Sequence, residues 1–310
     1  MKLQQLRYLV EVARQGLNVS DAAEKLHTSQ PGISKQIRLL EDELGVQVFI
    51  RNGKRVVDVS PPGKEILKIA ERILREAANL KRVGEEYANE SVGSLTIATT
   101  HTQARYALPS VIHQFVEQYP KVRLSIKQGS PTQICEMVVA GEADIAIATE
   151  GIELFSELTM LPCYSWNRSV VVPEGHPLLA LGHDVALEEI SAYPIITYDF
   201  AFAGRSKINK AFESRGITPN VVLTAIDTDV IKTYVGLGLG VGLIASMAFE
   251  PQRDVGLRAI DASHLFEAST TRIGIRRDAY LRGYTYAFIE LFAPHQTRAT
   301  VEAAMGRHEE

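Results

Sequence analysis

Four polar side chains near the N-terminus have the chemistry needed to read base pairs. They lie on one side of a predicted helix over residues 29–44, opposite an apolar stripe, and are Gln30, Ser34, Lys35 and Arg38. A glutamine amide can pair with adenine in a bidentate manner, a lysine or arginine can reach guanine, and a serine hydroxyl can serve several partners. This face therefore predicts a helix that reads DNA in the major groove.

Three cations follow at the tip of a predicted hairpin. Two β-branched runs, 48–50 and 56–59, flank Asn52-Gly53, a pair typical of tight hairpin turns. The cations at the tip are Arg51, Lys54 and Arg55. Such side chains contact backbone phosphates, which position a protein on DNA without reading its sequence.

A second group of side chains offers neutral hydrogen-bond donors. Thr100, Thr102 and Gln103 follow a predicted strand and open a helix, whose free N–H groups and dipole favour an anion. Ser130 follows the second predicted strand, and Thr149 ends the third. Because the carboxyl ends of parallel strands meet at one edge, where ligands bind, these side chains predict a site for a small oxyanion or carboxylate. The alternative is that the hydroxyls only cap helices.

Short predicted helices must position the side chains that are expected to read DNA. An apolar stripe predicts a helix that Gly16 ends, Ser20 is expected to cap a second helix, and Ser29-Gln30-Pro31 open a third. No glycine lies between Leu26 and Ser29, although such turns often contain one. The pattern indicates a winged helix-turn-helix, against the alternative of a three-helix packing unit with a solvated face.

A long helix is predicted after this unit. Pro61-Pro62-Gly63 is expected to break the chain, and the helix continues to about Asn89. Apolar and small residues recur along it at heptad spacing, which is typical of a helix pair. The expected dimerisation seam includes Ile66, Ala70, Ile73, Ala77 and Leu80. The alternative is an amphipathic helix that lies on its own domain.

The rest of the chain alternates predicted strands and helices, which indicates parallel sheets covered by helices. The strands are expected at 94–99, 122–128, 144–149, 194–198, 221–225 and 241–245. The helices are expected at 104–118, 132–140, 206–215 and 229–237. Two such blocks predict two subdomains with a cleft between them, followed by a polar tail that frays.

Composition restricts the class of protein. The net charge is −4, yet residues 1–88 carry a net positive charge, which favours contact of this part with a polyanion. No apolar stretch reaches the ~18 residues of a membrane span, and no signal-peptide pattern is present, so a cytoplasmic protein is expected. The two cysteines and the spacing of the histidines predict neither a disulfide scaffold nor a metal site, and no cofactor is expected. Trp166 is expected to be a packing residue.

Residues 1–60 resemble the winged helix-turn-helix of LysR-type transcriptional regulators. The matching residues include Leu6, Ala22-Ala23, Leu26, Ser29-Gln30-Pro31, Ser34, Ile37, Leu40-Glu41, Leu44-Gly45, Val48-Phe49, Arg51 and Pro62-Gly63. The resemblance covers nearly the whole chain and is strongest to the branch of the family that controls cysteine biosynthesis. The blocks that carry this second resemblance are 28–38, 97–106, 229–235 and 261–267.

The resemblance implies an α/β protein with an N-terminal winged helix-turn-helix (1–60), a linker and dimerisation helix (61–91), and a periplasmic-binding-protein-like effector domain (92–300) before a polar tail (301–310). Subdomain I would span about 92–161 and 267–300, and subdomain II about 162–266. It also implies a non-enzymatic regulator, mainly an activator of sulfur-assimilation genes. Its implied partners are promoter DNA, acetylserine or sulfate as effector, RNA polymerase and three further copies in a homotetramer.

The resemblance further implies which residues bind the effector. Thr100, Thr102, Gln103 and Thr149 would hold the anion, together with a segment that here includes Phe202 and Ala203. Ala203 stands where relatives usually carry a threonine, and a missing side-chain hydrogen bond costs ~1 kcal/mol. Three rival functions remain open: a regulator of another pathway, an enzyme on the same fold, and a solute-binding protein. The enzyme lacks a clear acid–base pair in the predicted site.

Overall fold

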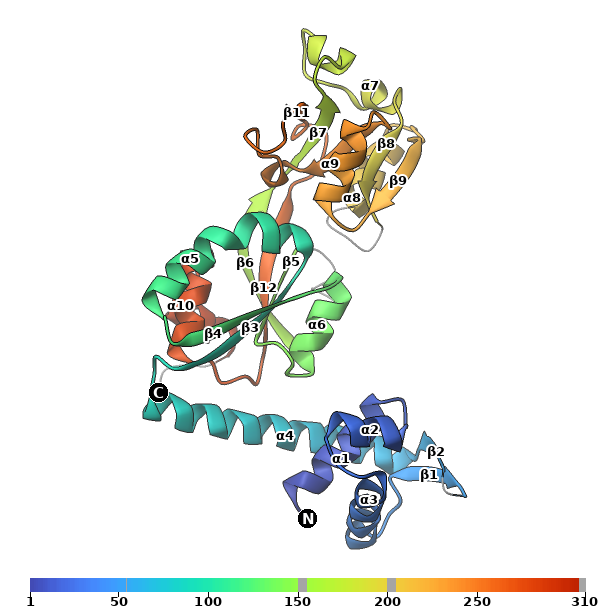
Figure 1. The fold of residues 1–310 in the computed structure, drawn as a ribbon, viewed down its shortest axis with the longest axis vertical. Coiled ribbons are helices and arrows are strands. Elements are labelled where there is room, and N and C mark those ends of the chain that lie inside the picture. Colours follow the sequence, from blue (N-terminus) through green and yellow to red (C-terminus); the bar gives the residue numbers. More distant parts are fainter. Residues whose placement is uncertain (54, 150–154, 200–204, 307–310) are drawn as a thin grey trace. The chain divides into compact units, whose positions relative to one another are not determined.

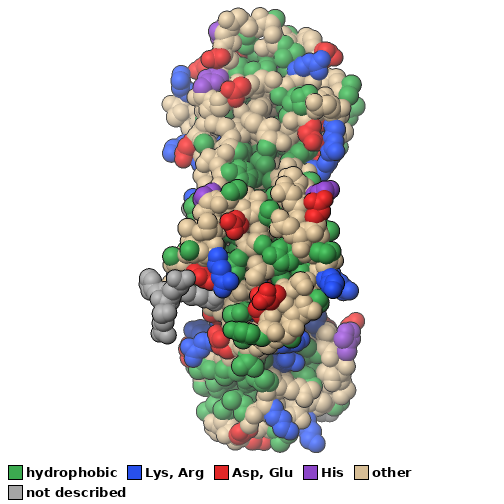
Figure 2. Space-filling model, turned by 90° about the vertical axis from the view of Figure 1, so that its left-hand side faces the viewer, with side chains coloured by type: hydrophobic (Ala, Val, Ile, Leu, Met, Phe, Trp, Pro, Cys, Tyr) green, Lys and Arg blue, Asp and Glu red, His purple; other side chains and the backbone are tan. Residues whose placement is uncertain are grey.

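The computed structural model describes residues 1–53, 55–149, 155–199 and 205–306 (Figure 1). The chain divides into two compact units, Met1–Gly84 and Glu85–Glu310. Within the described residues, no helix is both long enough and apolar enough to cross a membrane. Side chains of both charge signs are interspersed over the face shown in Figure 2, without a large patch of one sign.

The first unit is a helix-turn-helix followed by a two-stranded wing (Figure 1). Its elements in chain order are α1 (Leu3–Arg14), α2 (Val19–Lys25), α3 (Gln30–Leu44), β1 (Phe49–Asn52), β2 (Arg55–Val59) and the first part of α4 (Pro61–Ala88). The apolar stripes of the three short helices meet in one core, in which Leu9, Ile33 and Leu40 are fully buried. β1 and β2 pair antiparallel, as the Asn52-Gly53 turn predicts.

The helix caps differ from the prediction at one point. Asn18, not Ser20, caps α2: its side-chain oxygen accepts from the N–H groups of Ser20 and Asp21. Ser20 instead lies inside the first turn as a donor. Ser29 caps α3 by accepting from Gly32 N at 3.2 Å, and Gly45 ends α3 in the left-handed conformation with φ +69°, both as predicted.

The predicted break at Pro61-Pro62-Gly63 is wrong, because α4 begins at Pro61. The prolines lie in the first turn, where a missing N–H is harmless. Ser60 caps this turn by accepting from Gly63 N at 3.0 Å. Gly63 itself lies against the wing entry, where a Cβ would come within 2.2 Å of the Val48 carbonyl oxygen, so the packing of α4 requires a glycine there.

The seam of α4 divides into two parts. Ala70 is buried in the core of the first unit, and Ile66 and Ile73 pack against the same core. For the first half of this helix, the alternative of an amphipathic helix that lies on its own domain therefore applies. Ala77 is half-buried, whereas Leu80 remains 78% exposed within this chain. The second half keeps an apolar residue that the chain itself does not cover.

The second unit contains two five-stranded sheets. The first has the order β4-β3-β5-β12-β6 and the second β11-β7-β10-β8-β9 (Figure 1). The strands of the first sheet are β3 (Gly93–Thr99), β4 (Val122–Gln128), β5 (Ile145–Ala148), β6 (Leu158–Trp166) and β12 (Ser269–Arg276). Those of the second are β7 (Arg168–Pro173), β8 (Ile195–Tyr198), β9 (Val221–Ala225), β10 (Val241–Ala245) and β11 (Leu257–Asp261).

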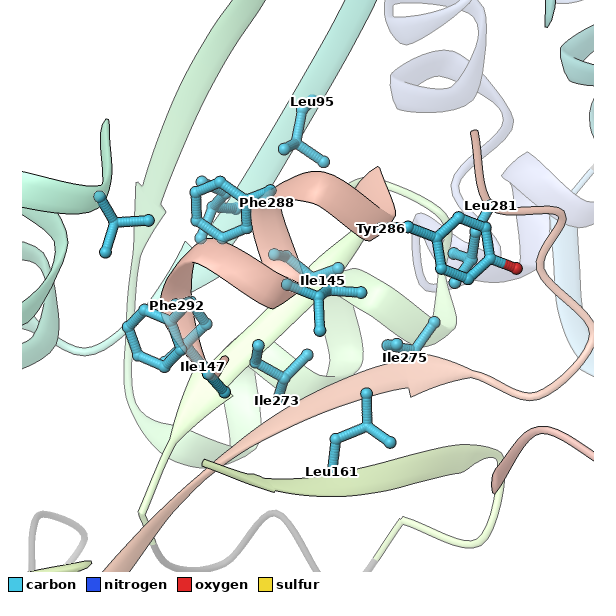
Figure 3. Close-up of a cluster of buried hydrophobic side chains, with 14 of the residues drawn as sticks. Leu95, Ile145, Ile147, Leu161, Ile273, Ile275, Leu281, Tyr286, Phe288 and Phe292 are labelled. Atoms are coloured by element: carbon cyan, nitrogen blue, oxygen red, sulfur yellow. The ribbon is translucent and has the colours of Figure 1, made fainter. Parts of the chain in front are cut away.

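Helices cover these sheets. They are η1 (Gln103–Ala107), α5 (Leu108–Gln118), α6 (Pro131–Val139), η3 (Pro177–Ala180), α7 (Leu187–Ser191), α8 (Arg205–Ser214), α9 (Thr228–Gly236), η4 (Ser246–Ala248), α10 (Gly283–Phe292) and α11 (Arg298–Ala304). Figure 3 shows the core of the first subdomain, in which Phe288 and Phe292 of α10 face Ile145, Ile147 and Ile273 of the sheet.

The prediction of purely parallel sheets is wrong. All six predicted strands form, and β3 pairs parallel with both β4 and β5. However, β12 runs antiparallel to β5 and β6, and β7 runs antiparallel to β10 and β11. The four additional strands, β6, β7, β11 and β12, carry the chain from one sheet to the other and back.

Two expected boundaries differ from the elements of the structure. The expected subdomain boundary at 161/162 falls inside β6, which pairs with β12 from Leu158 to Trp166; the chain crosses to the second sheet at Asn167. Position 267, the expected return to subdomain I, lies just before β12. The polar tail does not begin at 301, because α11 extends to Ala304 and Val301 is fully buried in the core of the first subdomain. Thr297 caps this helix by accepting from Thr300 N.

Candidate functional site

The exposed face of α3 gathers the predicted base-reading residues. Gln30, Lys35 and Arg38 are exposed and Ser34 is half-buried, while Ile33 and Ile37 on the opposite side are buried. A shallow hollow on this face is lined by Gln30, Pro31, Ser34, Lys35, Arg38 and Leu39. Gln30 Nε2 donates to Ser34 Oγ at 3.3 Å, which orders the amide along the helix surface.

Two of the predicted residues have structural roles at the start of this helix. The hydroxyl oxygen of Ser29 is used as the cap of α3, and Pro31 lies in its first turn. A second polar hollow brings the exposed Arg55 of the wing to the same side as Gln30. The structure therefore places Gln30 on the exposed face of α3 and Arg55 of the wing along a common surface.

Arg51 has a partner that the sequence did not reveal. Its Nη2 lies 2.8 Å from Glu41 Oε2, and Glu41 is buried within the first unit. Glu41 Oε1 also accepts from the backbone N–H groups of Val48 and Phe49 at 2.9 and 3.1 Å. Arg51 thus fixes the wing to α3 through a carboxylate, instead of standing as the free cation that the tip was expected to carry. Lys54 lies outside the described residues.

The neutral donors that were predicted to bind an anion lie at the carboxyl edge of the first sheet. Thr99 pairs with Ile147, so the chain after β3 and the chain after β5 leave the sheet side by side. The side chains of Thr100, Gln103 and Thr149 are all buried at this edge. Gln103 begins a π-helical turn, η1, which continues into α5. Such wider turns occur frequently at functional sites.

A hydrogen-bond cluster connects the donors to residues that the sequence analysis missed. Gln103 Nε2 donates to Thr271 Oγ1 at 3.2 Å, and the Tyr164 hydroxyl donates to Gln103 Oε1 at 2.5 Å. Trp166 Nε1 donates to Thr271 Oγ1 at 3.1 Å and approaches Thr149 Oγ1 at 3.3 Å. Trp166 is therefore more than the packing residue expected, and no pattern in the sequence marks it or Thr271.

Thr102 belongs to another cluster. Its hydroxyl lies 3.4 Å from Thr228 Oγ1, which is 2.6 Å from the Tyr198 hydroxyl. Tyr198 Oη accepts from Ala245 N at 3.1 Å. Because Thr228, Tyr198 and Ala245 belong to the second subdomain, Thr102 joins the two subdomains. Among the described contacts, none connects its side chain to the Gln103 cluster.

Ser130 acts as a helix cap. It begins α6, where its hydroxyl accepts from Gln133 N and its N–H donates to the Gln133 side chain. It follows β4, which neighbours β3, but no hydrogen bond joins it to Gln103 or Thr149 within the described residues. For Ser130 the alternative of helix capping therefore applies. Phe202 and Ala203 lie outside the described residues.

Ionic contacts join the same two subdomains beside Thr102. The Tyr106 hydroxyl donates to Asp229 Oδ1 at 2.6 Å and accepts from the buried Lys232 Nζ at 2.8 Å. Lys232 also pairs with Asp254 at 2.8 Å, and His101 Nε2 lies 3.5 Å from Asp227. None of these residues was predicted as functional. A lysine three residues after Asp229 on an apolar helix was the only signal.

These contacts also explain an apparent cluster of metal ligands. Ligand atoms of His101, Asp227 and Asp229 lie within 4.8 Å of one another. Asp229, however, is already paired with Lys232 at 3.3 Å and Arg105 at 3.6 Å. Cationic side chains thus compensate this carboxylate, and the cluster carries no argument for a metal ion.

Burial keeps the site's hydroxyl groups protonated. Desolvation raises the pKa of Tyr164 to about 12, although hydrogen bonds with Thr271 and Gln103 lower it. Burial likewise raises the pKa of Tyr198 above its ordinary range. Both tyrosines are therefore neutral donors at physiological pH. Among the described hydrogen bonds, none uses the Thr100 hydroxyl.

Comparison with known proteins fits this architecture. Residues 3–64 match the family described as "Bacterial regulatory helix-turn-helix protein, lysR family", and residues 88–297 match the "LysR substrate binding domain". The chain is 55% identical to the transcriptional regulator SsuR of Burkholderia cenocepacia, covering 97% of both chains. It is 54% identical to CysB of the same organism, covering 98% of this chain and 97% of that one.

A solved structure extends the likeness to the second unit. The crystal structure of the cofactor-binding domain of the Cbl transcriptional regulator is 42% identical to this chain, covers 70% of it and 95% of the solved domain, and has a TM-score of 0.67. The expected fold class, a helix-turn-helix domain with a two-subdomain α/β domain, is confirmed. These relatives are regulators and not enzymes, and the chain belongs to the LysR family of transcriptional regulators.

Proposed function

We propose that this regulator controls sulfur-assimilation and cysteine-biosynthesis genes, mainly as an activator, in response to a small anion. The observation that carries the proposal is the buried donor set at the carboxyl edge of the first sheet, where Thr100 follows β3, Gln103 and Thr149 both contact Thr271, and the described side-chain partners of Gln103 and Thr149 are all neutral. Neutral donors suit a small anionic ligand that must be released again. Relatives named CysB, at 53–54% identity, support the assignment to sulfur metabolism.

The proposed effector is an acetylated serine or sulfate. Thr100 and Gln103 would hold its negative charge through their side chains and the helix start beside them. Thr149 would contact it from the neighbouring strand end. Thr102 and Ser130 would act less directly, because their hydroxyl groups already serve the subdomain contact and the α6 cap. Phe202 and Ala203 would complete the site on the resemblance alone.

In the proposed DNA complex, α3 lies in the major groove. Gln30, Lys35 and Arg38 would contact base edges, with Ser34 contacting a base or phosphate. Ser29 and Pro31 would orient the start of the helix near the DNA backbone. Arg55 and Lys54 would contact phosphates, and Arg51 would support the wing. The protein would act in the cytoplasm as a homotetramer on promoter DNA and recruit RNA polymerase.

A second candidate is regulation of a different gene set. The chain is 55% identical to SsuR and 54% identical to CysB, and both relatives come from one organism. The experiment that separates the candidates is footprinting on promoters of cysteine-biosynthesis genes and on a genomic library, with and without acetylserine. Protection at the cysteine promoters that changes with acetylserine is expected. Protection elsewhere alone would support the second candidate.

The effector site is tested with the Thr100→Val variant. This substitution keeps the shape of the side chain and removes one donor, and hydrogen bonds to charged groups contribute ~1.5–3 kcal/mol. We expect calorimetry to show acetylserine or sulfate affinity reduced roughly ten- to a hundred-fold. DNA affinity without ligand should stay unchanged, because α3 belongs to the other unit. Wild-type affinity for both ligands in the variant would show that the site lies elsewhere.

A further inference from the structure

One leucine of α3 is exposed although the helix already has a buried apolar side. Ile33, Ile37 and Leu40 lie in the core of the first unit, whereas Leu39 is 46% exposed. Leu39 comes four residues after Lys35, so these two side chains are neighbours on the helix surface. The core of the first unit therefore does not require an apolar residue at position 39.

Leu39 borders the same hollow as the side chains that are proposed to read bases. This hollow is lined by Gln30, Pro31, Ser34, Lys35, Arg38 and Leu39. Long side chains of a helix lean toward its N-terminus, so Leu39 covers the turn that carries Lys35. Leu39 and Pro31 are thus the apolar members of a surface whose other members are polar.

DNA offers one apolar partner to such a side chain in the major groove. The base edges there present hydrogen-bond donors and acceptors, and thymine alone adds an apolar substituent, the methyl group at C5. Gln30, Lys35 and Arg38 can pair with the donors and acceptors, but the side chain of Leu39 forms no hydrogen bond. The group on DNA that matches Leu39 chemically is therefore the thymine methyl group.

We propose that Leu39 is a specificity-determining residue, whose side chain contacts the methyl group of a thymine in the operator. This proposal rests on the proposed function, because it requires α3 to lie in the major groove. The thymine would lie beside the base that Lys35 contacts, since Leu39 covers the same turn of the helix. Loss of one buried methyl group corresponds to about a fourfold loss of affinity.

The test replaces single thymines of the operator by deoxyuridine, which lacks only the methyl group. The operator is first obtained by selection from random DNA with the full chain, and its thymines are then replaced one at a time. We expect fluorescence anisotropy to show that wild type loses about fourfold in affinity at one thymine or more. At one of these positions, Leu39→Ala should bind the two DNAs equally. Leu39→Met keeps a long apolar side chain and should retain most of the difference.

The matched control is Leu44→Ala. Leu44 is exposed at the end of the same helix and does not line this hollow. At the thymine that depends on Leu39, Leu44→Ala should show the same loss as wild type. Alanine is a strong helix former, so both exposed positions should tolerate it, which thermal unfolding checks. If both alanine variants abolished the difference, the specific role of Leu39 would be overturned.

The results separate this proposal from the proposed function. If wild type selects no preferred sequence from random DNA, the proposed reading of bases by α3 fails, and the role of Leu39 fails with it. If a preferred sequence emerges but every uracil replacement affects wild type and Leu39→Ala equally, the reading by α3 stands and the role of Leu39 is overturned. If Leu39→Ala lowers the sedimenting mass without a change at any thymine, Leu39 contacts another copy of the chain instead, which also overturns the proposal.

Discussion

His27 occupies the tight turn between α2 and α3 with φ +49°, a left-handed conformation that glycine adopts without strain. The missing glycine in this turn therefore does not change its geometry. The His27 backbone N–H donates to the Glu24 carbonyl oxygen at 3.0 Å, but its exposed side chain makes no hydrogen bond or ion pair among the described contacts, so no side-chain contact compensates the cost of the conformation. Histidine tolerates this region better than β-branched residues do.

Replacing His27 with glycine should stabilise the protein. We expect His27→Gly to raise the free energy of unfolding of the first unit by up to ~1 kcal/mol, because relief of strain exceeds the greater entropy of the unfolded chain. Urea unfolding measures it. His27→Ala is the control, since alanine must adopt the same conformation. Equal stability of the two variants would show that the backbone is not the cause.

Substitutions on the exposed face of α3 and on the wing should affect DNA binding in different ways. Arg38→Ala is expected to lower the discrimination between operator and random DNA by ~1–3 kcal/mol, because it removes a base contact. Arg55→Ala should weaken binding to both DNAs and reduce the salt slope by about one, as loss of a phosphate contact does. Fluorescence anisotropy at several salt concentrations measures both. Equal losses on both DNAs for Arg38→Ala would contradict its base-reading role.

At the scale of elements, the hairpin and α3 behave as one piece. Glu41 lies on α3, and its carboxylate accepts from the wing's backbone and pairs with Arg51. A buried carboxylate with several donors satisfies groups that water cannot reach. The position of the wing relative to the recognition helix is thus fixed by one side chain of that helix.

The second half of α4 provides the test of dimerisation. Leu80 is exposed in the single chain, so Leu80→Glu should dissociate the oligomer without unfolding the first unit, because a charge would enter a helix pair. Ile73→Glu should also destabilise the fold, because Ile73 packs against the core. Sedimentation and thermal unfolding measure the two effects. Lys68→Glu, at an exposed position outside the seam, serves as control. An unchanged mass for Leu80→Glu would place the dimer interface elsewhere.

At the scale of the molecule, the contacts of η1 with α9 join the two subdomains of the second unit. Asp229 lies at their centre. Burial raises the pKa of Asp229, but hydrogen bonds from Tyr106 and Lys232 and the charges of Lys232 and Arg105 lower it further, so the net shift is downward. A carboxylate with a lowered pKa stabilises the folded state above its unfolded pKa, and this stabilisation is lost as the pH falls.

The Asp229→Asn variant should reveal this contribution. We expect it to lose about 1 kcal/mol of unfolding free energy at neutral pH, a modest value because the carboxylate is 41% exposed and screened by solvent. The difference from wild type should stay constant down to about pH 5, where an unfolded aspartate begins to protonate, and then shrink as the pH falls further. Urea unfolding across this range measures it. A difference that changes near neutral pH would contradict the assignment to Asp229.

The amino-acid sequence by itself determined the helix-turn-helix, the wing turn and the parallel strands β3, β4 and β5, because short-range periodicity, caps and the Asn52-Gly53 turn carry those signals. It also indicated the polar side chains at the edge of the first sheet. The strands β6, β7, β11 and β12, which make the antiparallel pairings, escaped prediction, since pairing between strands far apart in the sequence leaves no local pattern. Tertiary structure alone decided that Glu41 holds Arg51 and that Thr271 and Trp166 stand behind Gln103 and Thr149. Such contacts depend on which distant strands become neighbours, and no spacing along the chain records that.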